Sequence, residues 1–153
     1  MPAAVRVRLR RRGHIRRKAV TALANAILSA VGEPNAELCV ELIGDRGMQR
    51  LNREYRGRNT STDVLAFSQR EAEGGPRSVL LGDVVISVHT AVRQARVRHH
   101  SADEELAVLL IHGILHLCGY DHERSESEAR RMRRRELIVR RLVHPLPRLI
   151  GSC

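Results

Sequence analysis

Hydrophobic and polar residues alternate at the start of the chain and then change to a helical spacing. The alternation predicts a half-buried strand over residues 4–10, in which the apolar residues are Val5, Val7 and Leu9 and the polar ones are arginines. The next apolar residues recur at helical intervals and predict a helix over 14–31 that ends before Gly32. The residues with this spacing are Ile15, Ala19, Ala22, Ala26 and Ala30. A strand over 37–43 follows, so the chain opens as strand, helix, strand.

The rest of the chain continues to mix helices and strands. The pattern predicts helices over 45–55, 88–98, 102–118 and 126–143, and strands over 64–67 and 82–88. Glycines and a proline within 70–77 indicate an exposed turn rather than a domain linker, because a strand resumes directly afterwards. Two capping boxes mark the starts of the last two helices: Ser101 with Glu104, and Ser125 with Glu128. The helix over 102–118 is almost wholly apolar after Glu105, so we expect it to be the central buried helix.

Four strands and about five helices in this order predict an α+β fold, with one domain over residues 1–153 and a mixed four-stranded sheet. The 153 residues are 42% hydrophobic, which suffices to bury a core without disulfide bonds. No segment approaches the roughly 20 apolar residues of a membrane span, so no membrane partner is expected. The chain has three cysteines without paired spacing, which favours a reducing compartment, and we expect a cytoplasmic protein.

The charge of the chain adds a class of partner to this picture. Lysine and arginine number 27 against 17 acidic residues, and the resulting charge of +10 favours nucleic acid as the partner. The chain has only three aromatic residues: Tyr55, Phe67 and Tyr120. These are too few for a platform of stacked bases, so contacts with nucleic acid must be mainly ionic. The arginines within 6–10 and 130–135 supply much of the charge, either as phosphate contacts or as solvated residues that maintain solubility.

A histidine motif supplies the candidate chemistry. His112 and His116 are four residues apart and therefore project from one face of a helix, about 40° apart around its axis. Gly119 follows where a helix can end in the left-handed conformation, which would turn the chain and bring His122 to the same point. Three imidazoles with an open fourth position are typical of a catalytic zinc site, which predicts one Zn²⁺ per chain. Cys118 points to another side of the helix and is expected in the core.

The spacing His-x-x-x-His-x-x-Gly-x-x-His is that of the metzincin metalloproteases, so the motif predicts a metzincin-like zinc helix. In those enzymes a glutamate follows the first histidine and acts as the general base. Here Gly113 takes that place, and the charge of +10 also suits RNA better than a peptide. A peptidase therefore stays as the alternative enzyme class.

The sequence around the histidines, His-Gly-x-Leu-His-Leu-x-Gly-Tyr-Asp-His over 112–122, resembles the signature of the endoribonuclease YbeY family of bacterial rRNA maturation factors. Three upstream blocks resemble that family in the same order. These blocks are Leu51-Asn52-x-x-Tyr55-Arg56-Gly57, Thr62-Asp63-Val64-Leu65-Ala66-Phe67 and Leu81-Gly82-Asp83-Val84-Val85-Ile86-Ser87. The likeness covers about residues 38–143. Asn59, Ser61 and His99 depart from the family, which commonly has Asp, Pro and Gly there.

The resemblance implies a zinc ion held by His112, His116 and His122, and a functional arginine at Arg56. It implies cleavage of single-stranded RNA during the processing of the 3′ end of 16S rRNA and in ribosome quality control, with ribosomal particles as partners and no role for DNA. An arginine opposite a zinc ion would bind phosphate oxygens and stabilise the charge that develops in the transition state. A third reading, a ribosome assembly factor with structural zinc and little or no catalysis, stays open beside the nuclease and the peptidase.

Overall fold

A four-stranded sheet is the frame of the computed structural model, which describes residues 4–9, 14–60, 62–70 and 79–150. Its strands are β1 (Ala4–Leu9), β2 (Glu37–Ile43), β3 (Val64–Ser68) and β4 (Leu80–Ser87), in the order β1-β2-β4-β3. Strands β1, β2 and β4 run parallel to one another, whereas the edge strand β3 runs antiparallel to β4. The mixed four-stranded sheet predicted from the sequence is confirmed.

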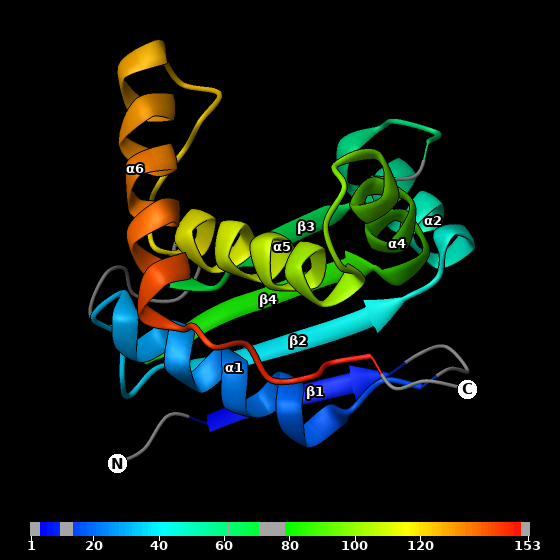
Figure 1. The fold of residues 1–153 in the computed structure, drawn as a ribbon. Helices are drawn as coiled ribbons and strands as arrows, with labels where there is room; N and C mark the ends of the chain where they lie inside the picture. The colour runs from blue at the N-terminus through cyan, green and yellow to red at the C-terminus, as the bar shows by residue number, and fades with distance from the viewer. Residues whose placement is uncertain (1–3, 10–13, 61, 71–78, 151–153) are drawn as a thin grey trace.

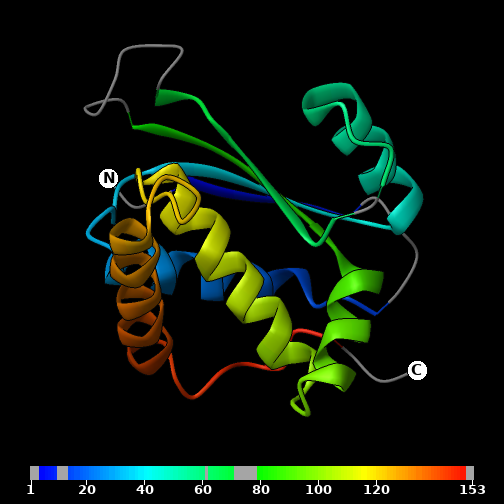
Figure 2. The same cartoon turned by 90° about the horizontal axis from the view of Figure 1, so that it is seen from above.

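Five helices are described, and they cover the two faces of the sheet unequally. They are α1 (Arg17–Ala30), α2 (Asp45–Arg56), α4 (Val88–Val97), α5 (Ala102–Leu117) and α6 (Glu126–Leu142). Helices α1, α4, α5 and α6 lie on one side of the sheet and α2 lies on the other (Figures 1 and 2). None of the helices in the described part of the chain is long and apolar enough to cross a bilayer. The α+β class expected from the sequence is confirmed.

Helix α5 is the centre of the main core, as its apolar sequence predicts. A row of paired residues crosses the sheet beneath it, from Val7 through Val40 to Val84, and all three are buried. The α5 residues packed into this core with under 2% exposure are Leu106, Leu110, Ile111, Ile114 and Leu115. A smaller cluster under α2 joins Met48 to Leu65 and Val85 on the opposite face.

The prediction for the first helix is wrong in its buried face and its start. The buried residues are Val20, Leu23, Ala24, Ile27 and Leu28, whereas Ala22 and Ala26 are exposed. Burying the larger side chains removes more apolar area from water than burying the alanine stripe, and this decides the orientation. Ile15 lies before the helix and bridges to Ile150.

Strand β4 begins at Leu80, two residues earlier than expected, because Leu80 pairs with Glu37 of β2. Residues 71–77 of the expected turn, and Arg10, lie outside the described residues.

Serine residues cap the helices that follow the sheet. Ser101 Oγ accepts a hydrogen bond from the Glu104 N–H at 3.1 Å, and Ser125 Oγ accepts one from the Glu128 N–H at 3.1 Å. These contacts confirm the predicted starts of both helices. The two glutamate side chains contact arginines instead of completing the boxes: Glu104 with Arg140 and Glu128 with Arg131. Glu104 thereby joins α5 to α6.

Gly113 allows α5 to approach the sheet closely. A Cβ built on this residue would lie 2.6 Å from Val84 Cγ1 and 3.1 Å from Val84 Cγ2, so the valine or the helix would have to shift to admit any side chain. A glutamate at this position, as in the metzincins, would therefore collide with the sheet at the present helix distance. The absence of a general base at position 113 follows from the packing of the fold.

Helix α2 is anchored at its first residue by Asp45. Its carboxylate accepts hydrogen bonds from Ser87 Oγ at 2.7 Å, Thr90 Oγ1 at 3.0 Å and Arg93 Nη1 at 2.9 Å. Partial burial opposes ionisation, but these hydrogen bonds and the Arg93 charge outweigh it and lower the pKa of Asp45 to about 2. The network fixes the start of the helix whose other end carries Arg56.

The contact at Gly113 predicts opposite effects for two glycine-to-alanine substitutions. We expect Gly113→Ala to destabilise the protein by about 1 to 2 kcal/mol, because overpacking against a stiff valine outweighs the gain in helix propensity. Gly47→Ala in α2 is the matched control, since its Cβ would meet Ile43 Cδ1 at an ordinary 3.4 Å. That variant should be unchanged or more stable by up to about 1 kcal/mol. Urea unfolding measures both, and equal effects of the two substitutions would contradict the packing argument.

The low pKa of Asp45 predicts a pH-dependent contribution to stability. Its pKa is lower in the folded state than the usual value near 4, so the stabilisation is complete above pH ~4 and is lost as the pH falls toward 2. We expect Asp45→Asn to be less stable than wild type at pH 6, with the difference shrinking steadily below pH ~4. Unfolding free energies over this range test it. A difference that stays constant down to pH ~2.5 would show that the carboxylate charge is not responsible.

Candidate active-site cleft

The predicted site residues line one cleft of about 800 Å³ between α5 and the edge strand β3. His112 and His116 come from α5, His122 comes from the turn after it, and Arg56 comes from the end of α2. The structure therefore brings all four residues to the same hollow, although Arg56 and His122 are far apart in the sequence.

The end of α5 explains how His122 reaches the cleft. The helix closes with hydrogen bonds from the Gly119 N–H to the His116 carbonyl at 3.1 Å and from the Tyr120 N–H to the Leu115 carbonyl at 3.1 Å. Gly119 has a φ of 100°, a conformation that side chains disfavour, and the chain reverses there. The reversal places the His122 ring 5.0 Å from the His112 ring, centroid to centroid, with 61° between their planes. The predicted turn at Gly119 is confirmed.

The separation of these two rings fits metal binding. Two imidazoles on one tetrahedral zinc ion have ring centroids roughly 5 Å apart, given Zn–N bonds of about 2 Å. His116 lies one turn beyond His112, lines the same cleft and is exposed. Within the described ranges, no three His, Cys, Asp or Glu side chains are gathered closely enough to hold an ion. The separation of the His112 and His122 rings is therefore compatible with two ligands of one ion, and the three-histidine zinc site stays a prediction.

Glu136 of α6 orients the first histidine. Its Oε1 lies 2.8 Å from His112 Nδ1. An ionised carboxylate only accepts, so in the neutral imidazole Nδ1 carries the proton and Nε2 keeps a free lone pair. This is the arrangement that prepares a histidine to bind a metal. Sequence reasoning missed Glu136, although it is the one acidic residue in the arginine-rich stretch 130–141.

Arg56 lies at the end of α2, where Gly57 ends the helix with a φ of 68°. Its Nη2 is 3.9 Å from Glu123 Oε1, and the same oxygen is 3.9 Å from His122 Nε2. These contacts are long and the Glu123 side chain is 68% exposed, so they contribute little to stability. The geometry nevertheless places one carboxylate between the arginine and a candidate ligand. Glu123 was also missed from the sequence.

The loop after Arg56 is held by side chains of α2. Asn52 Nδ2 donates to the Thr60 carbonyl at 2.8 Å, and Gln49 Nε2 donates to the Asn59 carbonyl at 3.2 Å. Gln49 Nε2 also donates to Asn59 Oδ1 at 3.3 Å, so the asparagine side chain takes part in this contact, while Ser61 lies outside the described residues. His99 has a φ of 57°, which explains why a glycine suits this position better.

Cys118 behaves as the core residue that the sequence predicts. It packs against the main core, and burial raises the pKa of its thiol to about 11. Cys118 is not among the residues that line the cleft, so it is not placed to be a ligand there.

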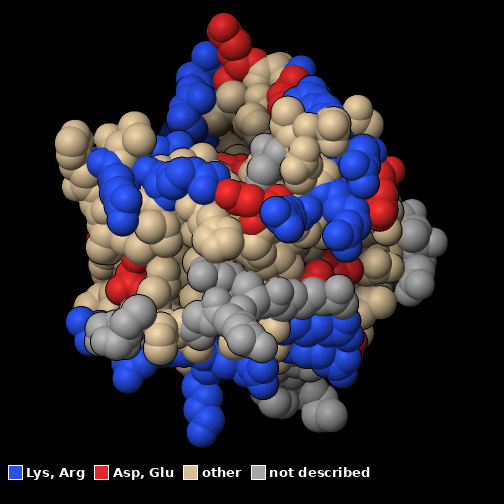
Figure 3. Space-filling model, turned by 90° about the vertical axis from the view of Figure 1, so that its right-hand side faces the viewer, with Lys and Arg blue, Asp and Glu red and all other residues tan. Residues whose placement is uncertain are grey.

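The excess positive charge is spread over the molecule. Arg6 and Arg8 line a separate hollow of about 940 Å³ on the sheet, together with acidic residues such as Glu37 and Asp83. Figure 3, from the side of α2 and α4, shows basic side chains over much of this face with acidic ones between them. The arginines that line the cleft itself are Arg56, Arg58 and Arg98. Net charge alone therefore does not locate the site.

Comparison with known proteins identifies the family. The family model described as Endoribonuclease YbeY matches residues 8–142. A relative named Endoribonuclease YbeY from Geobacter metallireducens is 49% identical over 116 residues, which are 74% of this chain and 77% of the relative. The relative of the same name from Aquifex aeolicus is 44% identical over 135 residues, 88% of each chain. The one from Anaeromyxobacter sp. is 47% identical over 131 residues, 85% of this chain and 66% of that relative.

The fold agrees with these matches. The solution structure of a protein from Thermotoga maritima aligns with a TM-score of 0.64 and 25% identity, and covers 91% of this chain and 89% of that one. The sequence blocks at 51–57, 62–67, 81–87 and 112–122 lie within the residues matched by the family model. The chain belongs to the endoribonuclease YbeY family, a family of nuclease hydrolases.

Proposed function

We propose that this protein is a zinc-dependent endoribonuclease specific for single strands, which processes the 3′ end of 16S rRNA and acts in ribosome quality control in the cytoplasm. The observation that carries the proposal is the position of the Glu123 carboxylate, 3.9 Å from both Arg56 and His122 in a cleft lined by three histidines. Membership of the endoribonuclease YbeY family supports it.

The Glu123 carboxylate marks a place where this cleft accepts an anion. The side chain is mostly exposed and weakly held, so an RNA phosphate can displace it at little cost. A phosphate in that place would contact the guanidinium of Arg56 on one side and lie beside the histidines on the other. Arg56 would then bind two phosphate oxygens and hold the charge that grows on them as the bond to the leaving oxygen breaks.

The three histidines are the residues that would hold zinc. His112, oriented by Glu136, offers Nε2, and His122 faces it from the turn. His116 completes the set from the next turn of α5. A bound zinc ion supplies a Lewis acid that activates water and neutralises phosphate charge near pH 7. The protein contributes the orientation of the ligands and the place of the phosphate relative to them.

The arginines outside the cleft support a large RNA partner. Arg133 and Arg134 on α6 are exposed and make no ion pair within the described part of the chain. Such residues add affinity for ribosomal particles without setting the position of cleavage. DNA and membranes are not expected partners.

Zinc binding is the first test of this function. We expect about one zinc ion per purified chain, and less than a tenth of that in a triple variant with alanine at His112, His116 and His122. His144→Ala, exposed and distant from α5 in the sequence, is the control and should keep its zinc. Elemental analysis after gel filtration measures the content. Stoichiometric zinc in the triple variant would remove these ligands from consideration.

The role of Arg56 is the second test. We expect Arg56→Ala to lower the cleavage rate of a single-stranded RNA by roughly 100- to 1,000-fold with unchanged zinc content, and Arg56→Lys to recover only part of the loss. Arg53→Ala, exposed on the same helix, should be active. The assay also includes a casein-like substrate, and cleavage of casein but not RNA would favour the peptidase. Zinc-loaded protein that cleaves neither substrate would favour an assembly factor, and wild-type turnover by Arg56→Ala would remove the proposed role.

A further inference from the structure

Arg98 lines the same cleft as the histidines and Arg56 but has no part in the function proposed so far. We propose that Arg98, held in place by the buried Glu105, binds a second phosphate of the RNA strand, one or two nucleotides from the phosphate at Arg56. The inference rests on the proposed function and adds to it the direction in which the strand lies in the cleft.

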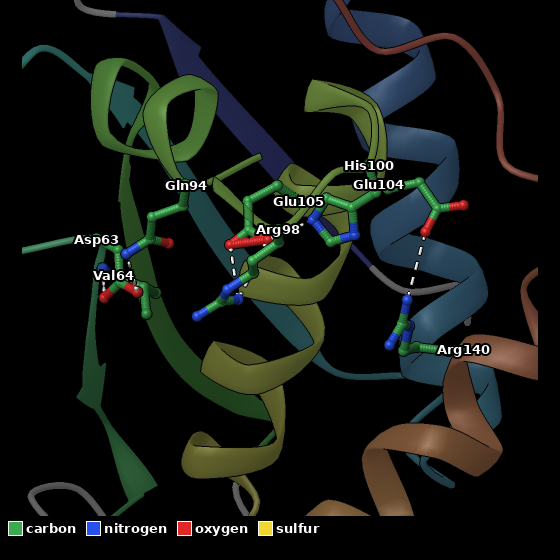
Figure 4. Close-up of polar contacts among 8 residues, drawn as sticks. All are labelled: Asp63, Val64, Gln94, Arg98, His100, Glu104, Glu105 and Arg140. Carbon is green, nitrogen blue, oxygen red and sulfur yellow. Dashed lines mark hydrogen bonds and ion pairs between the residues drawn. The ribbon is translucent and has the colours of Figure 1, made fainter. Parts of the chain in front are cut away.

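Glu105 is a carboxylate with no access to water. It is 0% exposed in α5, and its oxygens lie 3.2 Å and 3.0 Å from Arg98 Nη1 and 2.7 Å from His100 Nε2 (Figure 4). A buried carboxylate without such partners would be strongly destabilising. The fold therefore holds Arg98 in one orientation, although the Arg98 side chain itself is 53% exposed.

The contact uses only one side of the guanidinium. Both short distances to Glu105 involve Nη1, whereas Nε and Nη2 make no hydrogen bond or ion pair with any residue that the structure describes. An arginine fixed by a carboxylate on one side and open on the other is prepared to bind an anion. The conformational entropy of its long side chain is already restricted before binding.

The other carboxylates near Arg98 are engaged elsewhere. Asp63, which also lines the cleft, accepts a hydrogen bond from the Val64 N–H at 2.8 Å and one from Gln94 Nε2 at 3.3 Å (Figure 4). Glu136 accepts from His112. Neither residue competes for the open side of Arg98.

The spacing along α5 suits a single strand. Glu105 and His112 are seven residues apart, so they lie two turns and about 10 Å apart on the same face of the helix. Val108 and Leu109 line the cleft between them and offer an apolar floor to a ribose or a base. A strand bound at both ends of this segment would follow α5 from the histidines toward Arg98.

A phosphate scan tests the inference. A cleavable single-stranded oligoribonucleotide is prepared as a series in which one phosphate at a time is replaced by an uncharged methylphosphonate. For wild type, we expect a replacement one or two positions from the cleaved bond, on one side only, to raise KM roughly three- to tenfold. For Arg98→Ala, KM should be raised by the same factor on the unmodified RNA, and that replacement should have no further effect.

Two further variants separate this role from a structural one. Arg96→Ala removes an exposed arginine of α4 that does not line the cleft, and should keep the wild-type profile. Arg98→Lys keeps a cation for Glu105 but lacks the free Nε and Nη2 groups of the guanidinium. It should show wild-type thermal stability and a KM between those of wild type and Arg98→Ala. If Arg98→Ala fails to fold, the KM of Arg98→Lys tests whether Arg98 binds a phosphate.

The inference is overturned if a folded Arg98 variant has the wild-type KM, or if its scan has the same sensitive position as wild type. Such results with an active wild-type enzyme leave the proposed function intact. If wild type cleaves none of the RNAs, the proposed function fails, and the second phosphate site fails with it.

Discussion

The distance between α5 and the sheet is the constraint on which the cleft depends. Gly113 sets it, because the absence of a side chain there lets the helix backbone rest on Val84, within 2.6 Å of where a Cβ would lie. Gly113 has His112 before it and Ile114 after it along the chain. His112 lines the cleft, whereas Ile114 is buried in the core. Since a packed core does not deform continuously, His112 and His116 are positioned by the packing of α5 on the core, whereas His122 is positioned by the turn that follows the helix. The same contact explains why this family member lacks the glutamate that follows the first histidine in metzincins.

Acidic residues contact the cations and imidazoles of the cleft. Glu136 contacts His112, Glu123 lies between Arg56 and His122, and Glu105 fixes Arg98. They differ in burial, and burial decides what each can do. The fully buried Glu105 must keep its partners, because an unpaired charge there would be strongly destabilising. The exposed Glu123 is weakly bound and can give way to a substrate anion. The cleft therefore combines a carboxylate that must stay in place with one that can be displaced.

The sequence predicts local features well because they depend on neighbours in the chain. The alternation in β1, the serine caps of α5 and α6 and the reversal at Gly119 follow from residues within a few positions of one another. The buried face of α1 was predicted wrongly, because two apolar stripes compete on that helix and only tertiary packing chooses between them. Glu136, Glu123 and Glu105 were missed for a related reason. Glu136 contacts a residue of another helix, Glu105 contacts the loop before its own helix, and Glu123 lies near Arg56 at the end of α2. A glutamate looks the same in sequence whether it is solvated or orients another side chain.

The net charge of +10 and the few arginines of the cleft would contribute to RNA binding in different ways. Charges spread over the surface create a field that attracts a polyanion from a distance, and that field is insensitive to register and weakened by salt. A guanidinium fixed by a carboxylate acts only at contact and only on a phosphate in the right place. Because a single strand can slide along a uniformly basic surface, the position of cleavage must come from the fixed groups. In the function proposed for this protein, those groups would be Arg98, anchored by the buried Glu105, and Arg56, carried at the end of a helix whose start is held by Asp45.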